Sequence, residues 1–204
     1  MRMEEFIEAV GSSDPAPGGG SVSALCGALS AALSRMVVGL TLGKKKYEDV
    51  KGEMEDMLPD LEKLGRELLE AVEKDSRSFE QYMAALSLPK ETEEEKAVRF
   101  KAMQEGLKAA VIVPLSVAEK SLSILPYAKA VAARGNRTAV TDALVSAMTA
   151  RTAVLGAVFN VKINLKSIED EVFVREIYQK ATYLEQKAEL MEEEIRCLTF
   201  GALN

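Results

Sequence analysis

The chain has 204 residues with 26 basic and 32 acidic side chains, a formal net charge of −6, two cysteines and no histidine. The negative charge argues against nucleic acid as the main partner. Without histidine the chain lacks the usual general base near neutral pH, the commonest zinc ligand and the base of Ser-His or Cys-His catalysis, so we expect no metal site and proton transfer by Asp, Glu, Lys or Tyr.

The N-terminal part begins with a short amphipathic segment, Met1 to Val10, and continues into a loop rich in proline and glycine. Two prolines and three glycines between residues 14 and 20 disfavour regular structure, and a helix of small residues is predicted from Ser21 to about Gly43. Its first backbone N–H groups would favour anions and carbonyl oxygens. The candidate substrate-binding residues here are Pro17, Gly18, Gly19, Gly20 and Ser21. The structural alternative is a stiff loop that leads into a buried helix.

A stripe of this helix has almost no side chains, which would let another helix or a flat ligand approach the backbone closely. It is formed by residues four apart, namely Gly20, Ala24, Ala28 and Ala32. Lysines 44, 45 and 46 follow the helix end. They are typical of a C-terminal cap, and as candidate binding residues Lys45 and Lys46 could hold the carboxylates of an acidic ligand.

The longest predicted helix, from about Val50 to Leu86, carries an acidic residue in its apolar face. Four-three alternation from Leu68 gives positions 68, 72, 75, 79, 82 and 86, and Asp75 occupies the third of them. A carboxylate there must be ion-paired, hydrogen-bonded to a ligand, or neutral with a raised pKa. We interpret Asp75 as an acid/base group, and a structural salt bridge is the alternative.

The next helical pattern, from about Glu93 to Arg134, contains two prolines. We expect a kink or break at Pro114 and a second break near Pro126. The nearly uncharged segment from Thr138 to Leu165 carries polar groups at helical spacing, which must find partners on a neighbouring helix or on a bound molecule. The candidate binding residues of this segment are Asp142, Asn160 and Asn164.

The last predicted helix, from about Ser167, has a coiled-coil-like apolar seam from Ile177 to Leu198 that serves either the core or a subunit interface. The fold class expected is therefore all-α, an antiparallel up-and-down bundle of about five or six long helices in one domain, residues 1–204. Uninterrupted apolar runs of membrane-spanning length and a signal-peptide pattern are not apparent, and the two distant cysteines favour a reducing compartment, so we expect a cytoplasmic protein without a membrane partner.

Several motifs lie along the chain in a recognisable order. They are Pro15-Ala16-Pro17-Gly18-Gly19-Gly20-Ser21-Val22, Asp75 with Phe79 and Tyr82, Leu88-Pro89-Lys90, Gln104-Glu105-Gly106-Leu107, Val113-Pro114-Leu115, Gly135-Asn136 with Asp142, and Asn160-Val161-Lys162-Ile163-Asn164-Leu165. Together these motifs resemble the cyclodeaminase/cyclohydrolase family of folate enzymes. That family includes the C-terminal half of formimidoyltransferase-cyclodeaminase and stand-alone methenyltetrahydrofolate cyclohydrolases.

The resemblance implies an all-α homodimer that binds a tetrahydrofolate derivative as its substrate, holds no permanent cofactor, and uses Asp75 as the catalytic group. For such a substrate, Asp142, Asn160 and Asn164 are candidates to hold the pterin or orient the nucleophile, and Lys44 to Lys46 are candidates to bind the glutamate tail. Whether the site spans two subunits is left open.

Three functions are consistent with the sequence. The first is formimidoyltetrahydrofolate cyclodeaminase, which forms 5,10-methenyltetrahydrofolate and releases ammonia. The second is methenyltetrahydrofolate cyclohydrolase, which forms 10-formyltetrahydrofolate. The third is a non-catalytic helical dimer, in which Asp75 would pair with a core arginine such as Arg151.

Overall fold

The computed structural model describes residues 2–203, with side chains to residue 200. Helices follow one another in the order α1 (Met3–Val10), α2 (Gly19–Leu42), η1 (Lys45–Val50), α3 (Lys51–Leu86), α4 (Glu93–Leu122), α5 (Leu125–Arg134), η2 (Arg137–Ala139), α6 (Val140–Leu165) and α7 (Glu171–Leu203), where η marks a 3-10 helix. Over this range the predicted all-α fold is confirmed, and α2, α3, α4, α6 and α7 are the long helices.

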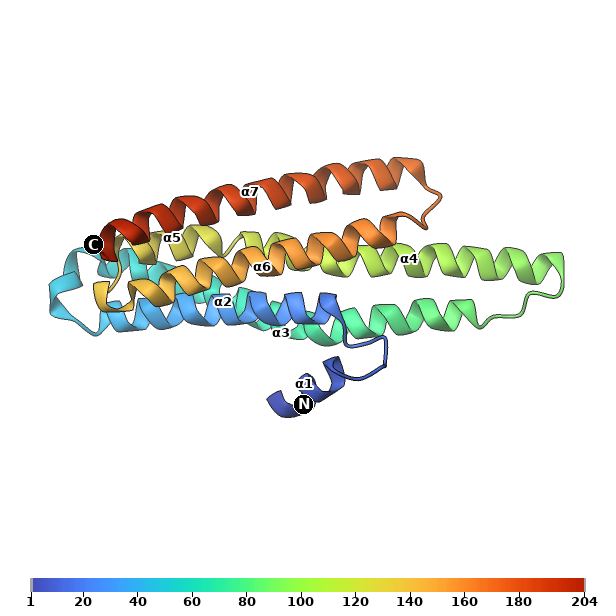
Figure 1. Ribbon diagram of the computed structural model, residues 1–204, viewed down its shortest axis with the longest axis horizontal. Helices are drawn as coiled ribbons and strands as arrows, with labels where there is room; N and C mark the ends of the chain where they lie inside the picture. Colours follow the sequence, from blue (N-terminus) through green and yellow to red (C-terminus); the bar gives the residue numbers. More distant parts are fainter. Residues whose placement is uncertain (1, 204) are drawn as a thin grey trace.

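The long helices run up and down along one axis (Figure 1). Helix α2 packs against α3 and α6, and α4 closes the group by contacting the same two helices. Helix α7 lies on the outside of α6 and also contacts α5, which continues the course of α4. Helix α2 begins about halfway along the bundle, so the far ends of α3, α4 and α6 extend beyond its N-terminus.

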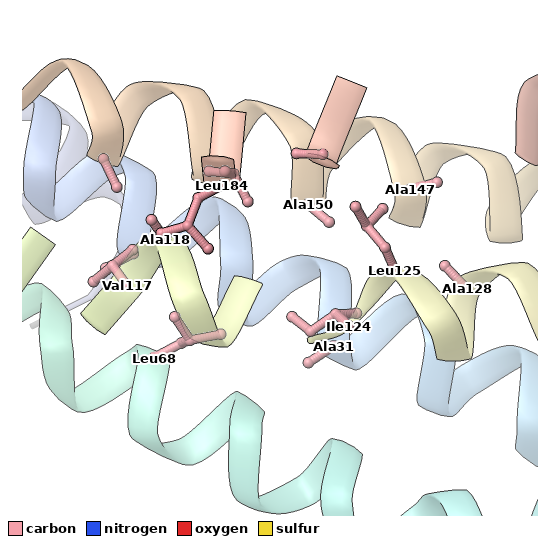
Figure 2. Packing of buried hydrophobic residues seen from close by; sticks show 14 of the residues in the cluster. Ala31, Leu68, Val117, Ala118, Ile124, Leu125, Ala128, Ala147, Ala150 and Leu184 are labelled. Carbon is pink, nitrogen blue, oxygen red and sulfur yellow. The ribbon is translucent and has the colours of Figure 1, made fainter. Parts of the chain in front are cut away.

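Small residues of α2 fill the centre of the bundle. Ala24 and Ala31 are fully buried, and Ala31 belongs to the same hydrophobic core cluster as Leu68 and Ile124 (Figure 2). The predicted stripe of residues four apart is wrong beyond Ala24, because Ala28 is half-buried and Ala32 is exposed. An α-helix has 3.6 residues per turn, so positions four apart rotate steadily away from a straight neighbour. The buried line therefore follows residues 20, 24, 27, 31, 34 and 38.

Serine hydroxyls join α2 to α6 in the middle of the bundle. Ser30 Oγ donates to the Ser146 carbonyl at 2.8 Å, and Ser146 Oγ donates to the Ser30 carbonyl at 2.8 Å. Ser34 Oγ lies 2.8 Å from Ser146 Oγ. Part of the predicted polar stripe of α6 thus has the structural role that was the alternative to ligand binding.

A kink or break was expected at Pro114, and the break is wrong, because α4 is helical from Glu93 through Leu122. A proline inside a helix leaves the carbonyl four residues earlier, here that of Ala110, without its usual N–H partner. Asn164 of α6 supplies a replacement, since its Nδ2 donates to the Ala110 oxygen at 3.1 Å. The second expected break is confirmed, with Pro126 in the first turn of α5.

The seam predicted in the last helix packs into the bundle core for most of its length. Ala181, Leu184, Ala188 and Ile195 are buried, but Leu198 is exposed and Thr199 is buried in its place. The same 3.6-residue rotation moves the inward position by one residue near the end of the helix.

Three helical segments in the described part of the chain are long and apolar enough to cross a membrane by length and composition. They are Gly19–Leu42, Glu93–Arg134 and Arg137–Leu165, and between 39% and 44% of the residues in their most apolar windows are buried inside the bundle. The apolar side chains that stay exposed on α2 and α6 form a surface that requires a separate explanation.

Candidate active site at the start of α2

Asp75 of α3 meets the first turn of α2. Ser21 Oγ lies 3.0 Å from Asp75 Oδ2 and 3.0 Å from the carbonyl oxygen of Val72, so its single hydrogen is shared between two acceptors on α3. The N-cap residue of α2, Gly18, has no side chain to accept from the free N–H groups of the first turn. The carboxyl group of Asp75 is therefore placed at the positive end of the α2 helix dipole.

Gly20 makes this close approach possible. A Cβ atom built on Gly20 would lie 2.2 Å from Asp75 Oδ1 and 2.5 Å from its Cγ, so any side chain here would force the Asp75 carboxyl group to move. The sequence predicted a helix beginning at Ser21, but Gly19 and Gly20 already belong to α2. The glycines are used here for the absence of a side chain, and neither Gly19 nor Gly20 has a positive φ angle.

The surroundings of Asp75 favour the protonated carboxyl group. Desolvation by burial raises its pKa above the usual value, and hydrogen bonds from the Ser21 hydroxyl and backbone amide oppose that shift without cancelling it. No charged side chain contributes to the pKa shift. Of the alternatives left open by the sequence, the structure therefore favours a carboxyl group with a raised pKa over a salt-bridged one.

The raised pKa makes a prediction about stability. The folded protein binds the Asp75 proton more tightly than the unfolded chain, so the contribution of Asp75 to stability is largest below its unfolded pKa of about 3.9 and falls as the pH rises through the folded-state pKa. An asparagine in its place would keep the shape without the charge. We expect the Asp75→Asn variant to melt at a higher temperature than the wild type at pH 7, with a difference that shrinks toward pH 4. Melting curves at equal protein concentration test this, and a variant less stable by a constant margin at every pH would contradict it.

Asn160 of α6 lies beside the same helix start. A Cβ atom on Gly19 would be 3.2 Å from Asn160 Nδ2, which donates to the Gly156 carbonyl at 2.8 Å. Ser23 fits against α6 in a similar way, because a Cβ on Gly156 would lie 2.3 Å from Ser23 Oγ. The amide oxygen of Asn160 stays free of the intrahelical hydrogen bond and is available to a ligand next to the glycines.

The other predicted binding residues lie elsewhere. Lys45 and Lys46 follow the C-terminal end of α2, and 24 residues of helix place them about 36 Å from Gly19. Asp142 is in the first turn of α6 and lies 18 residues from Asn160, or about 27 Å along the helix axis. Asn164 is occupied by the Ala110 carbonyl. Within one chain, the structure brings together only Asp75, Asn160 and the residues around Gly18 to Ser21.

Near the C-terminal end of α2, the lysines take part in a second cluster of polar side chains, which the sequence did not predict as a site. Asn136 is 2% exposed, and its Oδ1 accepts from Lys44 Nζ at 3.3 Å. Tyr47 OH accepts from the backbone N–H of Arg137 at 2.9 Å, and Lys46 Nζ lies 4.7 Å from the Tyr47 ring centre. That backbone hydrogen bond and Lys46 lower the pKa of Tyr47. The sequence signal was the tyrosine directly after three lysines.

A cavity of about 280 Å³ adjoins the Asp75 region and is lined by residues of α1, α2 and α3, including Phe6, Leu25 and Val72. In the described part of the chain, no group of three or more Cys, Asp or Glu side chains could hold a metal ion.

Arg151, the proposed structural partner of Asp75, lies 3.7 Å from Glu189 of α7. That pairing contradicts the salt bridge expected for a purely structural Asp75.

Known proteins resemble this chain along most of its length. Residues 2–183 match the Formiminotransferase-cyclodeaminase family. The chain is 40% identical over 186 residues to formimidoyltransferase-cyclodeaminase from Sus scrofa and covers 91% of its own length but 34% of that protein. It is 37% identical over 193 residues to methenyltetrahydrofolate cyclohydrolase from Methylorubrum extorquens, covering 95% of this chain and 93% of that one.

A solved structure also matches along the whole chain. The crystal structure of formiminotetrahydrofolate cyclodeaminase from Thermotoga maritima superposes with a TM-score of 0.89 at 30% sequence identity, covering 100% of this chain and 98% of that one. The fold and sequence together define a member of a family of folate enzymes. The chain belongs to the formiminotransferase-cyclodeaminase family, and it spans about one third of the length of the formimidoyltransferase-cyclodeaminases that it matches.

Proposed function

We propose that the chain is a formimidoyltetrahydrofolate cyclodeaminase that uses Asp75 as its acid/base group. The observation that carries this proposal is a carboxyl group with a raised pKa, placed against the glycine-rich start of α2 without a basic partner among the causes of its shift. A carboxyl group whose pKa is moved toward neutrality can both take and return a proton, which typically contributes 10²–10⁴-fold to a rate.

The reaction needs one proton removed and one proton delivered. N10 attacks the formimidoyl carbon of 5-formimidoyltetrahydrofolate, whose terminal nitrogen is in the protonated amidinium form, while the Asp75 carboxylate takes the N10 proton. The resulting tetrahedral carbon carries N5, N10 and an amino group. The Asp75 carboxyl then gives its proton to that amino group, ammonia leaves, and the N5–CH–N10 bridge of methenyltetrahydrofolate forms. Each proton transfer is assigned to this side chain, so the proposal needs no bound cofactor.

Methenyltetrahydrofolate cyclohydrolase is the second candidate, supported by the likeness to the Methylorubrum extorquens enzyme along nearly its full length. Here Asp75 would take a proton from water as the water oxygen bonds to the bridging carbon. It would then protonate N5 as the N5–carbon bond breaks, and the remaining hydroxyl proton would be released to water as the carbonyl of 10-formyltetrahydrofolate forms. The tetrahedral carbon differs from that of the first reaction only in carrying OH in place of NH2.

The absorbance of methenyltetrahydrofolate separates the two candidates. Purified protein is mixed with 5-formimidoyltetrahydrofolate in one experiment and with methenyltetrahydrofolate in the other. Accelerated appearance of the methenyl signal supports the cyclodeaminase, and accelerated loss supports the cyclohydrolase. If neither rate exceeds the uncatalysed one and folate does not bind, the chain is a non-catalytic helical protein.

We further propose that the chain works as a homodimer paired through α2 and α6. Large apolar side chains are exposed along both helices, namely Leu29, Met36 and Leu40 of α2 and Val145, Met148, Phe159 and Ile163 of α6. These two helices pack against each other, so their exposed apolar residues lie on neighbouring elements, and exposed apolar surface of this kind marks an interface. Burial against a second copy accounts for this surface without a membrane.

An antiparallel pairing would also bring the two separated groups of site residues together. A twofold axis crossing the middle of α2 places the N-terminus of one α2 beside the C-terminus of the other. Lys45 and Lys46 of the partner subunit would then approach the glycine-rich start of α2. The two lysines would be separated from Asp75 by roughly the length of the substrate's glutamate tail. They would hold the glutamate carboxylates of the substrate.

Mixed dimers provide the test. Asp75→Asn chains and Lys45→Ala/Lys46→Ala chains are each expected to have little activity at low concentrations of a polyglutamylated substrate. A heterodimer isolated with two different tags should regain one intact site of two, hence about half of the wild-type activity, if the lysines act across the interface. A site contained in one chain would give a heterodimer in which both sites are damaged, and recovery of activity would then be absent.

A further inference from the structure

The Asp75 carboxyl group lies between Ser21 and Gly20 of α2. Oδ2 lies 3.0 Å from Ser21 Oγ. Both oxygens lie close to the bare Cα of Gly20, where an added Cβ atom would be 2.2 Å from Oδ1 and 2.6 Å from Oδ2. Among the described residues, Ser21 is the one whose side chain donates a hydrogen bond to this carboxyl group. Ser21 therefore fixes the carboxyl group from the neighbouring helix through Oδ2.

Ser21 is itself fixed by its position. Its side chain is fully buried, and its hydroxyl group lies 3.0 Å from the Val72 carbonyl and 3.3 Å from Ser76 Oγ. These contacts are on α3, whereas Ser21 belongs to α2. The hydrogen bond to Oδ2 thus connects the carboxyl group to a second helix and restricts rotation about its last torsion angle.

We infer that Ser21 is a positioning residue for Asp75: its hydroxyl group holds Oδ2 and so fixes the orientation in which the carboxyl group exchanges its proton with the substrate. This inference rests on the acid/base role proposed above. It changes the role expected for Ser21, whose side chain points to α3, from substrate binding to orientation of the reacting group. Orientation matters because a misplacement of about 1 Å can cost about 10²-fold in rate.

A donated hydrogen bond also stabilises the ionised carboxylate, so Ser21 opposes the effect of burial. Charged groups on the surrounding helices do not compete with it. The first turns of α2 are uncharged, α6 presents Gly156 and Asn160, and α1 contributes Arg2 only to the neighbouring cavity. On α3 the nearest charged residues form exposed pairs, Glu70 with Lys74 and Glu73 with Arg77. Helix α4 directs Lys120 to Glu67 and Lys108 to Asp170.

The decisive experiment titrates Asp75 directly. Protein labelled with ¹³C at the aspartate carboxyl carbons is followed by NMR from pH 3 to 9, and the Asp75 signal is the one that disappears in Asp75→Asn. In Ser21→Ala the midpoint of that signal should move to higher pH, since the ionised form loses its donor. Ser34→Ala is the control: it removes another buried hydroxyl group of α2, one that contacts Ser146 of α6. It should leave the midpoint of the Asp75 titration unchanged.

Kinetics supply the second readout. Ser21→Ala should lower kcat about tenfold at pH 7, the loss expected for one hydrogen bond to a charged group, with KM changed by less than about twofold. The acid limb of its kcat profile should move to higher pH together with the NMR midpoint. Ser21→Thr keeps a hydroxyl group and should recover most of the kcat.

An Asp75 midpoint that is unchanged in Ser21→Ala would overturn the inference, and so would a loss of kcat without a shift of the pH profile. Comparison of Ser21→Ala with Ser34→Ala tests the inference even if the Ser21→Thr variant does not fold. Failure of the proposed function looks different, because the wild type would then turn over neither folate. In that case the role of Ser21 in the reaction is rejected together with the proposed function. The titration still measures the hydrogen bond between Ser21 and Asp75.

Discussion

Asp75→Asn should abolish turnover while the protein stays folded and continues to bind tetrahydrofolate. The amide keeps the shape of the side chain and can accept from Ser21, but it neither takes up nor delivers a proton. We expect kcat to fall by 10²–10⁴-fold, the usual contribution of general acid–base catalysis, with a dissociation constant for tetrahydrofolate within a few-fold of the wild-type value. Stopped-flow absorbance and isothermal calorimetry measure the two quantities.

Glu80→Gln is the matched control, since Glu80 is an exposed carboxylate on the same helix, five residues further on. It should leave both kcat and the dissociation constant unchanged. Wild-type turnover in Asp75→Asn would remove Asp75 from the mechanism. Loss of binding together with turnover would instead assign it to holding the substrate or to capping α2.

Gly20→Ala should damage both stability and activity, because the added methyl group would lie 2.2 Å from Asp75 Oδ1. Overpacking of this kind costs about 1–3 kcal/mol, and displacement of the carboxyl group should lower kcat by about 10²-fold or more. Denaturant unfolding and the methenyl absorbance assay measure the two effects. Gly39→Ala is the matched control on the same helix, where a Cβ would meet nothing within 4 Å. It should stabilise the protein by about 0.5–1 kcal/mol, the helix advantage of alanine over glycine.

A double-mutant cycle tests whether the clash is with Asp75. In an Asp75→Gly background the carboxyl group is absent, so most of the destabilisation caused by Gly20→Ala should disappear. An equal loss of stability in both backgrounds would show that α2 itself tolerates no side chain at this position. The contact between Gly20 and Asp75 would then be incidental.

The periodicity of the sequence was sufficient to locate the helices and the acidic residue that interrupts an apolar face. Asp75 stood out because its helix shows a regular pattern on both sides of it, and the structure places it against the glycine-rich segment at the start of α2. The sequence could not show that Asn164 serves the carbonyl of Ala110, since nothing local connects an asparagine to a proline fifty residues earlier. Only the packing of α6 against α4 brings them together.

Two further differences follow from helix geometry. Grouping Asp142 with Asn160 used their common face and neglected their axial separation, which at about 1.5 Å per residue is too long for one small ligand to bridge. The prediction that residues four apart form one stripe on α2 is wrong beyond Ala24, because residues at this spacing rotate steadily around the helix and leave the original face. In both cases the angular position of a residue around the helix has to be considered together with its distance along the axis.

The ends of α3 and α4 project beyond the start of α2, and nearly all residues between Ser87 and Val98 are exposed. Few tertiary contacts protect the backbone there, so this tip opens at a much lower free energy than the centre of the bundle, and its amide hydrogens exchange with solvent first. The Ser87–Thr92 turn is accordingly the natural point at which to divide the polypeptide. One fragment would retain Asp75 with the start of α2, the other would retain Asn160, and helix packing alone would have to reunite them.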